Sequence, residues 1–318
     1  MFTEKGNEKE KRQKIIQNHL DGKYKDDKKF YDDLKVCDEH LSKKELKMIN
    51  DENYIVLKDN KIIQKATFDF TEQEMKCLNY TLSKLIPNVD VKVEHRYWDI
   101  EYPLRDLLNA LRLKDGKANY QDIHDSIFAL KEKTKRIRFE RDNKIVHKPF
   151  NFFIDCEIEK EKKDENIKNY IVKVKFDNNI IPFVSKLKNK FTAPLLIYTL
   201  NLNSKYAIRM YELCKSWQEK GEFIFYIDKC RKQWCIPDTY SYGDIKRRVI
   251  DKAIDEINKK TDIQIGIKLN DKGKKMVHKT DRKIDWFVMQ VKRNENFNTI
   301  YQENDKKRKE FLENEKER

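Results

Sequence analysis

Residues 244–268 join a helical pattern directly to a strand pattern, and this junction limits the folds open to the chain. Ile245, Val249, Ala253 and Ile257 recur at intervals of four, so they form one apolar face of a helix. The next segment, DIQIGIKLN, alternates apolar and polar residues as a half-buried strand does. A second strand pattern, KIDWFVMQVK, follows a polar stretch. The order predicts a helix packed against a β-hairpin.

The segments before this junction supply the rest of a small domain. LNLNSKYAIRMYELCKSW predicts a helix with Tyr206, Met210, Leu213 and Trp217 on one face, and EFIFYI predicts a short strand. DKCRKQWCI predicts a short helix that ends before Pro237. Helix, strand, helix, turn, helix and hairpin is the order of a winged helix, which is a helix-turn-helix with a hairpin appended.

The first half of the chain shows a similar order. YIVLKDNKII predicts strand-like segments around a turn at Asp59–Asn60, and Thr71 with Glu74 forms a capping-box pattern that starts a helix. Two more helical patterns precede strand patterns in RIRFER, FNFFIDCEI and NYIVKVKF. We therefore predict an α+β fold with two tandem winged-helix domains and charged ends. The predicted divisions are an N-terminal arm at 1–51, domain 1 at 52–190, domain 2 at 191–293 and a C-terminal tail at 294–318.

The charge balance of the chain favours an anionic partner. Lys and Arg total 69 against 55 Asp and Glu, which gives a formal charge of +14. Nucleic acid is the first candidate and an acidic membrane surface the second, while a Lys-rich proteome is the alternative explanation. No apolar run approaches the roughly 18 residues of a membrane span. The six scattered cysteines, with no secretory signal before them, predict reduced thiols in a soluble, cytoplasmic protein.

Three cations stand together at the start of the helix at 244–260. Lys246, Arg247 and Arg248 lie in the part of a helix-turn-helix that enters the major groove, and Lys246 and Arg247 point away from the apolar face, as Asp251 and Asn258 do. Cations at a helix N-terminus oppose the helix dipole, which costs a few tenths of a kcal/mol up to about one. An external anion such as DNA would relieve that mismatch. The alternative is a solvated face on which Arg247 is bridged to Asp251.

Two further groups of cations fit a DNA-binding role. The tip between the last two strand patterns is strongly basic, as expected of a wing that follows a phosphate backbone. Its basic residues are Lys272, Lys274, Lys275, His278, Lys279, Arg282 and Lys283. In the first domain, Lys131, Lys133, Lys135, Arg136 and Arg138 cluster at the end of the third helix. That cluster is suited to contacts with the phosphate backbone of DNA rather than with base edges.

Signatures of catalysis are missing from the sequence. None of the seven glycines belongs to a GxxxxGK[ST] nucleotide loop, and the histidines form neither an HxH nor an HExxH pair. Glu94, Asp99 and Glu101 form the best carboxylate cluster, but a carboxylate-rich surface contains many accidental pairs. We therefore expect a binding protein that is not an enzyme and holds no cofactor and no metal.

Several motifs resemble one protein family. NSKYAIRMYELCKSW, YGDIKRRVIDKAIDEINKKTDIQIGIKL and RKIDWFVMQVK closely resemble the replication initiator (Rep) proteins of iteron-containing plasmids. YIVLKDNKIIQKATFDFTEQEMKCLNYTLSKLIP is similar to that family's first domain, and FVSKLKNKFTAPLLIYTLNL to its domain junction. The resemblance covers roughly residues 53–293.

The resemblance implies two winged-helix domains that clamp a repeated DNA site at a plasmid origin. Implied partners are tandem origin repeats (iterons) in double-stranded DNA, a second copy of the chain in a monomer–dimer equilibrium, and the host helicase and host initiator. Repression of the protein's own gene by dimers is also implied, and no membrane role is. The implied DNA-binding residues are Ser241, Tyr242, Lys246, Arg247, Arg248, Lys205, Arg209, Lys274, Lys275, Arg282, Lys283, Asn119, Gln121, Lys135 and Arg136, with His124 beside them in the third helix of domain 1.

Two departures from the family pattern concern the dimer surface. Lys252 stands where many relatives place a proline, and the charged insert at 159–168 falls between two strand patterns. Two other functions stay open at this point. One is a winged-helix transcriptional repressor without an initiator role. The other is a rolling-circle nicking enzyme with a tyrosine nucleophile, against which the missing HxH pair counts.

Overall fold

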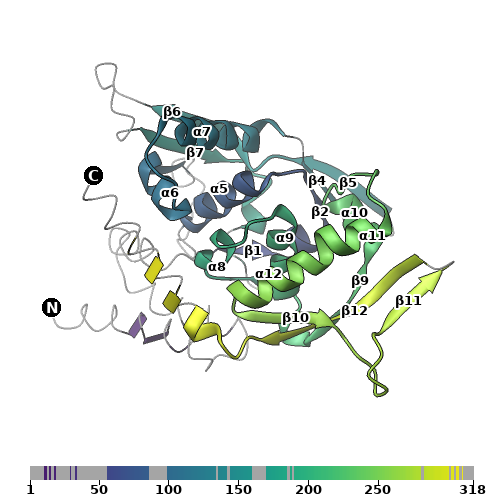
Figure 1. Ribbon diagram of the computed structural model, residues 1–318. Coiled ribbons are helices and arrows are strands. Elements are labelled where there is room, and N and C mark those ends of the chain that lie inside the picture. The colour runs from purple at the N-terminus through teal and green to yellow at the C-terminus, as the bar shows by residue number, and fades with distance from the viewer. Residues whose placement is uncertain are drawn as a thin grey trace.

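One helix, α9 (Lys205–Lys215), lies in the middle of the molecule and contacts both halves of the chain (Figure 1). The computed structural model describes residues 56–85, 99–133, 135–141, 144–159, 170–184, 187, 190–280 and 283–300, with single positions near the two ends. Nearly all of the arm at 1–51, the tail beyond 300, most of the insert at 159–168, Glu94 and Arg282 lie outside the described residues.

The first half places helices against a three-stranded sheet. Sheet order β3-β7-β6 is antiparallel throughout, with α5 and α7 packed together and α7 also packed on β6. A second sheet, β2-β4-β5, extends toward the other half (Figure 1). The elements are β1 (Lys58–Asp59), α4 (Asn60–Lys65), β2 (Ala66–Thr67), α5 (Glu72–Ser83), β3 (Asp99–Pro103), α6 (Leu104–Leu111), α7 (Lys117–Glu132), β4 (Lys135–Arg141), β5 (Lys144–Phe150), β6 (Phe153–Glu159), β7 (Ile171–Phe176) and the 3-10 turn η3 (Ile181–Phe183).

The expected turn at Asp59–Asn60 is wrong. Asp59 is instead the N-cap of α4, and its carboxylate accepts from the backbone N–H of Lys61 at 2.6 Å. Ile62 and Ile63 therefore bury their side chains from a helix, not from a strand. Their β-branched side chains favour strands only as a weak tendency, which a good cap and a buried site override. The capping box expected at Thr71 and Glu74 is confirmed.

The second half has the expected order of elements, except that Val277–Thr280, expected in the tip between two strands, form a strand of their own. Strand β12 forms the middle of its sheet, with β10 and β11 along one edge and β9 along the other. Phe225 stacks on Phe287 across the β9–β12 pair, with ring centroids 4.8 Å apart. The elements are β8 (Phe191–Thr192), α8 (Leu196–Leu200), α9, η4 (Gln218–Lys220), β9 (Glu222–Tyr226), α10 (Ile227–Gln233), α11 (Tyr242–Asp244), η5 (Ile245–Asp251), α12 (Lys252–Lys260), β10 (Ile263–Ile267), β11 (Val277–Thr280) and β12 (Lys283–Arg293).

The helix expected at 244–260 begins slightly earlier and changes its winding. Elements α11, η5 and α12 form one continuous helix, here called the recognition helix, and η5 is π-helical. Ile245, Val249, Ala253 and Ile257 are all buried, so the apolar face is confirmed. That face rests on α9, and the outward face spans the front of the molecule (Figure 1).

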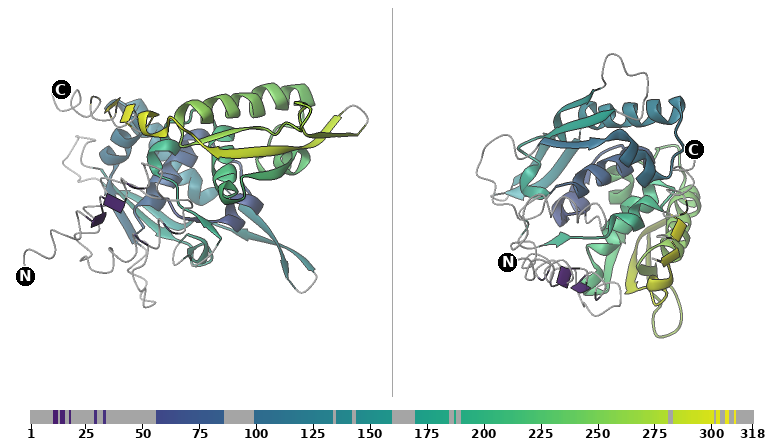
Figure 2. Two further views of the ribbon diagram at one scale, coloured as in Figure 1. Left: turned by 90° about the horizontal axis from the view of Figure 1, so that it is seen from below. Right: turned by 90° about the vertical axis from the view of Figure 1, so that its left-hand side faces the viewer.

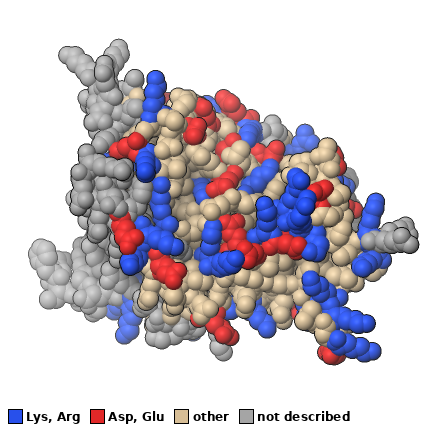
Figure 3. Space-filling model, viewed as in Figure 1, with Lys and Arg blue, Asp and Glu red and all other residues tan. Residues whose placement is uncertain are grey.

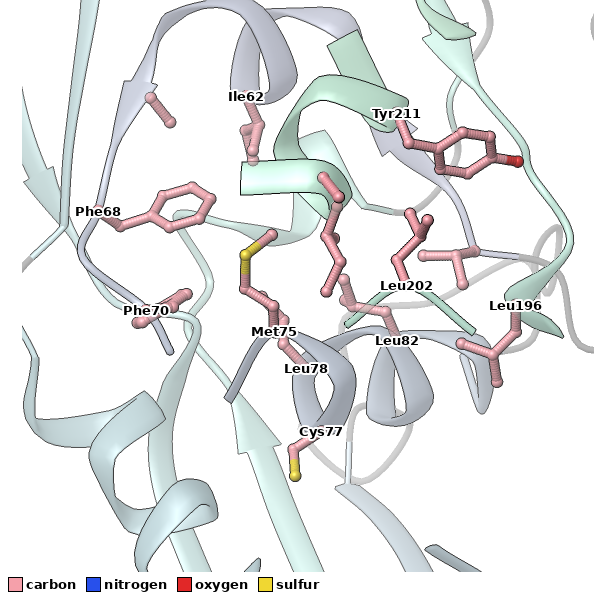
Figure 4. Packing of buried hydrophobic residues seen from close by; sticks show 14 of the residues in the cluster. Ile62, Phe68, Phe70, Met75, Cys77, Leu78, Leu82, Leu196, Leu202 and Tyr211 are labelled. Carbon is pink, nitrogen blue, oxygen red and sulfur yellow. The ribbon is translucent and has the colours of Figure 1, made fainter. Parts of the chain in front are cut away.

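The apolar core runs without a break through both halves. Figure 4 shows Ile62, Phe68 and Met75 of the first half beside the helix that carries Tyr211, whereas Cys77 points the other way. The sequence predicted one apolar face for α9, but α9 is buried on nearly every side because α4 and α5 cover one flank and the recognition helix covers another. Of the predicted stripe only Met210 is fully buried, while Tyr206, Leu213 and Trp217 are partly buried.

Charged side chains of α9 are buried along with its apolar ones. Glu212 accepts from the Lys58 ammonium at 2.6 Å and from the Asn79 amide at 3.2 Å, both from the first half. Lys215 pairs with Asp262 at 2.9 Å on the other flank. A buried charge is tolerated only when it is paired and hydrogen-bonded, so the contacts of Glu212 with Lys58 and Asn79 fix how the halves meet, while the Lys215–Asp262 pair holds α9 within the second half.

Glu212→Gln should destabilise the protein strongly. The variant leaves the buried Lys58 ammonium without its counter-charge, and breaking a buried pair in this way costs about 3–5 kcal/mol. Urea denaturation of both proteins measures the free energy of unfolding. Glu219→Gln, an exposed change in η4, is the matched control and should stay within about 0.5 kcal/mol of the wild type. Equal losses in the two variants would contradict a buried pair at Glu212.

Candidate nucleic-acid interface

The recognition helix starts at a doubly bonded cap. Ser241 Oγ accepts from the backbone N–H of Asp244 at 3.1 Å, and Asp244 Oδ2 accepts from the backbone N–H of Ser241 at 3.2 Å. Arg231 of α10 donates to the carbonyls of Asp238 at 3.3 Å and Tyr240 at 2.6 Å, which fastens the turn before the helix. The start of the helix is thereby held in a fixed position.

All three expected cations of this helix are solvent-exposed and carry an acidic partner. The exposed fractions of the side chains are 43% for Lys246, 71% for Arg247 and 51% for Arg248. Arg247 Nη2 lies 3.1 Å and Arg248 Nε 3.3 Å from Asp244 Oδ1, and Lys246 pairs with Asp251. The Arg248 guanidinium also lies over the Tyr240 ring at 5.2 Å.

The alternative pairing of Arg247 with Asp251 is wrong, and the winding of η5 explains why. In an α-helix, residues four apart lie on one face, whereas a π-helix closes its hydrogen bonds five residues apart. Lys246 and Asp251 are five apart and both lie in η5, so their side chains meet. Arg247 turns back to Asp244 instead.

The wing of the second half projects from the body of the protein. Strands β11 and β12 extend past the rest of the sheet at the lower right of Figure 1. His278 stacks on Trp286 with ring planes 3° apart, and Asp285 accepts from His278 and Thr280, which stiffens the hairpin. The described exposed lysines of this region are Lys272, Lys274, Lys275, Lys279 and Lys283. In Figure 3 the cations of this region stand out, while those over the recognition helix are interleaved with acidic groups.

Two tyrosines lie near one another at the starts of the recognition helix and of α9. Tyr240, beneath Arg248, lies within electrostatic range of Tyr206 at the start of α9. Lys205 lies over the Tyr206 ring at 5.2 Å and pairs with Asp69 at 2.6 Å. Lys205 is thus paired with the first half, and Tyr242, at the first turn of the recognition helix, is half-buried.

Two predicted DNA contacts are wrong because their side chains are buried. Arg209 is 4% exposed; it donates to the Ala66 carbonyl at 3.0 Å and lies over the Phe68 ring at 4.1 Å. Lys135 is fully buried, donates to the Leu130 carbonyl and lies 5.3 Å from the centre of the Phe70 ring. Both cations hold the fold together, and neither reaches the surface.

The polar residues expected on α7 lie elsewhere. Figure 1 shows α7 with the β3-β7-β6 sheet at the top of the molecule, away from α11. The Asn119 amide donates to the Lys114 carbonyl at 2.8 Å, and the Gln121 amide donates to Asp125 at 2.8 Å. His124 also contacts Asp125. The structure does not bring these side chains to the recognition helix.

A basic hairpin in the first half was missed by sequence reasoning. Strands β4 and β5 pair over their whole length, with Arg138 opposite His147, and β5 was not expected at all. Arg136, His147 and Lys148 are exposed on it. Figure 2 shows this hairpin and the wing projecting at the same end of the molecule. The signal available in the sequence was the polar pair Asp142–Asn143 between two β-branched segments, a hairpin turn pattern.

Other functional features are few in the described part of the chain. No group of three or more metal-ligating side chains comes together there. None of its helices has the length and apolar character needed to cross a bilayer. Cys214 and Cys230 are buried beside the core aromatics, as expected of thiols that fill space.

The fold and this basic surface define a tandem winged-helix protein. Residues 55–215 match the family model "Initiator Replication protein, WH1", and residues 226–291 match "Initiator Rep protein, WH2". The chain therefore belongs to the family of plasmid replication initiator (Rep) proteins, which confirms both the expected fold and the resemblance seen in the sequence.

A curated relative supports the same assignment. The chain is 34% identical over 125 residues to the PI protein of Escherichia coli, a match that covers 33% of this chain and 41% of that protein. The chain thus spans about two fifths of that relative's length. Two crystal structures of domains 2 and 3 of RctB are also similar, with TM-scores of 0.39 and 0.40 and 11% identity. They cover 69% and 70% of this chain and 80% and 83% of the RctB chains.

Removal of wing lysines should change the salt dependence of DNA binding. Loss of one phosphate neutralised by a lysine lowers the slope of log K against log salt by about one. Lys274→Ala with Lys275→Ala should therefore lower the slope by about two, measured by fluorescence anisotropy from low to moderate salt. Lys220→Ala, an exposed lysine of η4, is the control and should leave the slope unchanged. An unchanged slope in the double variant would rule out a wing that follows the backbone.

The buried Lys135 should give the protein a distinct pH dependence. Burial lowers the pKa of Lys135 to about 8, from 10.5. The unfolded chain then binds more protons than the native protein between about pH 8 and pH 10.5, so this group makes the free energy of unfolding rise with pH in that window. Lys135→Met should remove that rise, measured as the difference between the two proteins in urea at several pH values. Parallel pH profiles would show that Lys135 titrates normally.

Proposed function

We propose that this protein initiates plasmid replication by binding tandem repeats in double-stranded DNA at the origin. The observation that carries the proposal is the start of the recognition helix, where three exposed cations stand beside a basic wing. Membership of the Rep family supports the same role. The buried apolar face of the helix sets how far its outward face stands from the core.

Each part of the interface has a separate task in this proposal. Arg247 and Arg248 offer N–H groups to the O6 and N7 atoms of guanine in the major groove, while the wing lysines follow the phosphates. Lys205 and the β4–β5 hairpin extend the contact along the same duplex, because the hairpin and the wing project at the same end (Figure 2). Backbone contacts position the protein and base contacts give the specificity.

The protein itself acts as a binding protein and not as an enzyme in this proposal. Its sequence has no nucleotide-binding loop of the GxxxxGK[ST] type, so the free energy for opening the origin comes from binding and bending several repeats. The host helicase and the host initiator are recruited to the opened duplex. A dimeric form represses the gene by binding its promoter.

Replication of an origin plasmid tests the proposal. A plasmid carrying the gene and its flanking DNA should replicate in a permissive host, and footprinting should show protection of tandem repeats. Arg247→Ala should weaken repeat binding by about 1–3 kcal/mol and affect random DNA less. Lys259→Ala, on the far part of the same helix, is the control.

The outcomes separate this function from its rivals. Protection of a promoter operator alone, with no repeats, would identify a repressor without an initiator role. A covalent adduct with supercoiled origin DNA would identify a nicking enzyme. Replication failure together with the absence of repeat binding would refute the initiator proposal.

A further inference from the structure

We infer that Asp244 is a specificity-determining residue of the recognition helix: its carboxylate aims Arg247 and Arg248 at base edges and disfavours phosphate. This inference rests on the proposed function, because it concerns how the same helix distinguishes its repeat from other DNA. It assigns a role to an acidic residue at the centre of a basic surface.

The two oxygens of Asp244 have different partners. Oδ2 accepts from the backbone N–H of Ser241 at 3.2 Å and from its hydroxyl at 2.7 Å, which completes the cap. Oδ1 takes no part in the cap and faces Arg247 Nη2 at 3.1 Å and Arg248 Nε at 3.3 Å. A helix cap alone does not require the second set of contacts.

The carboxylate is ionised at neutral pH. Its hydrogen bonds to Ser241, followed by its contacts with the two arginines, hold the pKa of Asp244 below its usual value. A fixed negative charge therefore lies between two exposed cations. A phosphate that approaches the helix start is attracted by the arginines and repelled by Asp244. The net attraction of the helix start for the phosphate backbone of any DNA is therefore reduced.

The contacts also decide which N–H groups remain for DNA. Arg248 pairs with Asp244 through Nε and stands over the Tyr240 ring, so neither contact occupies its terminal Nη1 and Nη2 groups, and its side chain is 51% exposed. A pair of parallel N–H groups matches the O6 and N7 acceptors of guanine. A side chain held in this way loses less rotational freedom when it binds.

Asp251 provides a natural comparison within the same helix. It also pairs with a cation, Lys246, and its side chain is 46% exposed. A lysine ammonium is a point charge without a planar fork, so Asp251 reduces the attraction for DNA without aiming a base-reading group. Removal of either carboxylate changes the net charge by the same amount, but only Asp244 contacts arginines and can control their geometry.

Binding measurements on Asp244→Asn and Asp251→Asn test the inference. The probes are the duplex that the wild-type protein enriches from a random library of duplexes about two helical turns long, and a scrambled duplex of the same composition. Asp244→Asn should bind the scrambled duplex several-fold more tightly, and its preference for the enriched duplex should fall at least about fivefold. Asp251→Asn should strengthen both complexes alike and keep the preference.

The remaining outcomes are also decisive. Asp244→Glu keeps the charge and the capping box and should stay close to the wild type. If Asp244→Asn fails to fold, Asp244→Gln replaces it, because Gln keeps a capping-box side chain without the charge and should lower the preference in the same way. An unchanged preference in Asp244→Asn, or equal effects of the two Asn variants, would overturn the inference. Absence of any enriched duplex with the wild-type protein would instead refute the proposed function.

Discussion

The buried ion pair between Lys58 and Glu212 determines how the two halves of this protein meet. Burial of either charge without its partner would be costly, because the charge would lose its hydration with nothing to replace it. The native packing therefore requires both residues of the pair. Asn79 and the Ala66 carbonyl complete the polar contacts around α9, and apolar residues from both halves close over them. Because α9 also supports the recognition helix, the position of that helix follows from this junction.

The surface that faces DNA in the proposed function is nearly balanced in charge at its centre. Each of the three cations at the helix start has a carboxylate within hydrogen-bonding or ion-pair distance, while the wing lysines named above project into solvent. Non-specific attraction thus comes mainly from the wing, and the helix contributes geometry. This division suits the proposed function, in which the protein has to find a few repeats among many competing sites.

Much of the fold was predictable because its signals are local. The apolar spacing of Ile245 to Ile257, the capping box at Thr71 and the alternation in β10 and β12 each depend on a few neighbouring residues. The burial of Arg209 and Lys135 was not predictable, since it results from packing between segments far apart in sequence. The π-helical winding of η5 was not predicted either, because the sequence has helical spacing throughout this segment. The pairing of residues five apart, such as Lys246 and Asp251, becomes visible only once the backbone is known. Sequence patterns therefore located the recognition helix but wrongly placed Arg209 and Lys135 at the surface.

The shared position of α9 also limits how proteins of this kind can diversify. The ion pairs of Lys246 and Arg247 in the recognition helix are with carboxylates of that same helix, so in the proposed function a lineage can change its DNA preference by exchanging a few surface side chains. Exchange of a whole half with a relative is a different matter, because the foreign half would have to match the charge of Glu212 and the apolar contacts along α9. We therefore expect recombination in the middle of the gene to be disfavoured, because it separates residues that pack around α9. Point mutations on the outward face of the recognition helix should be tolerated.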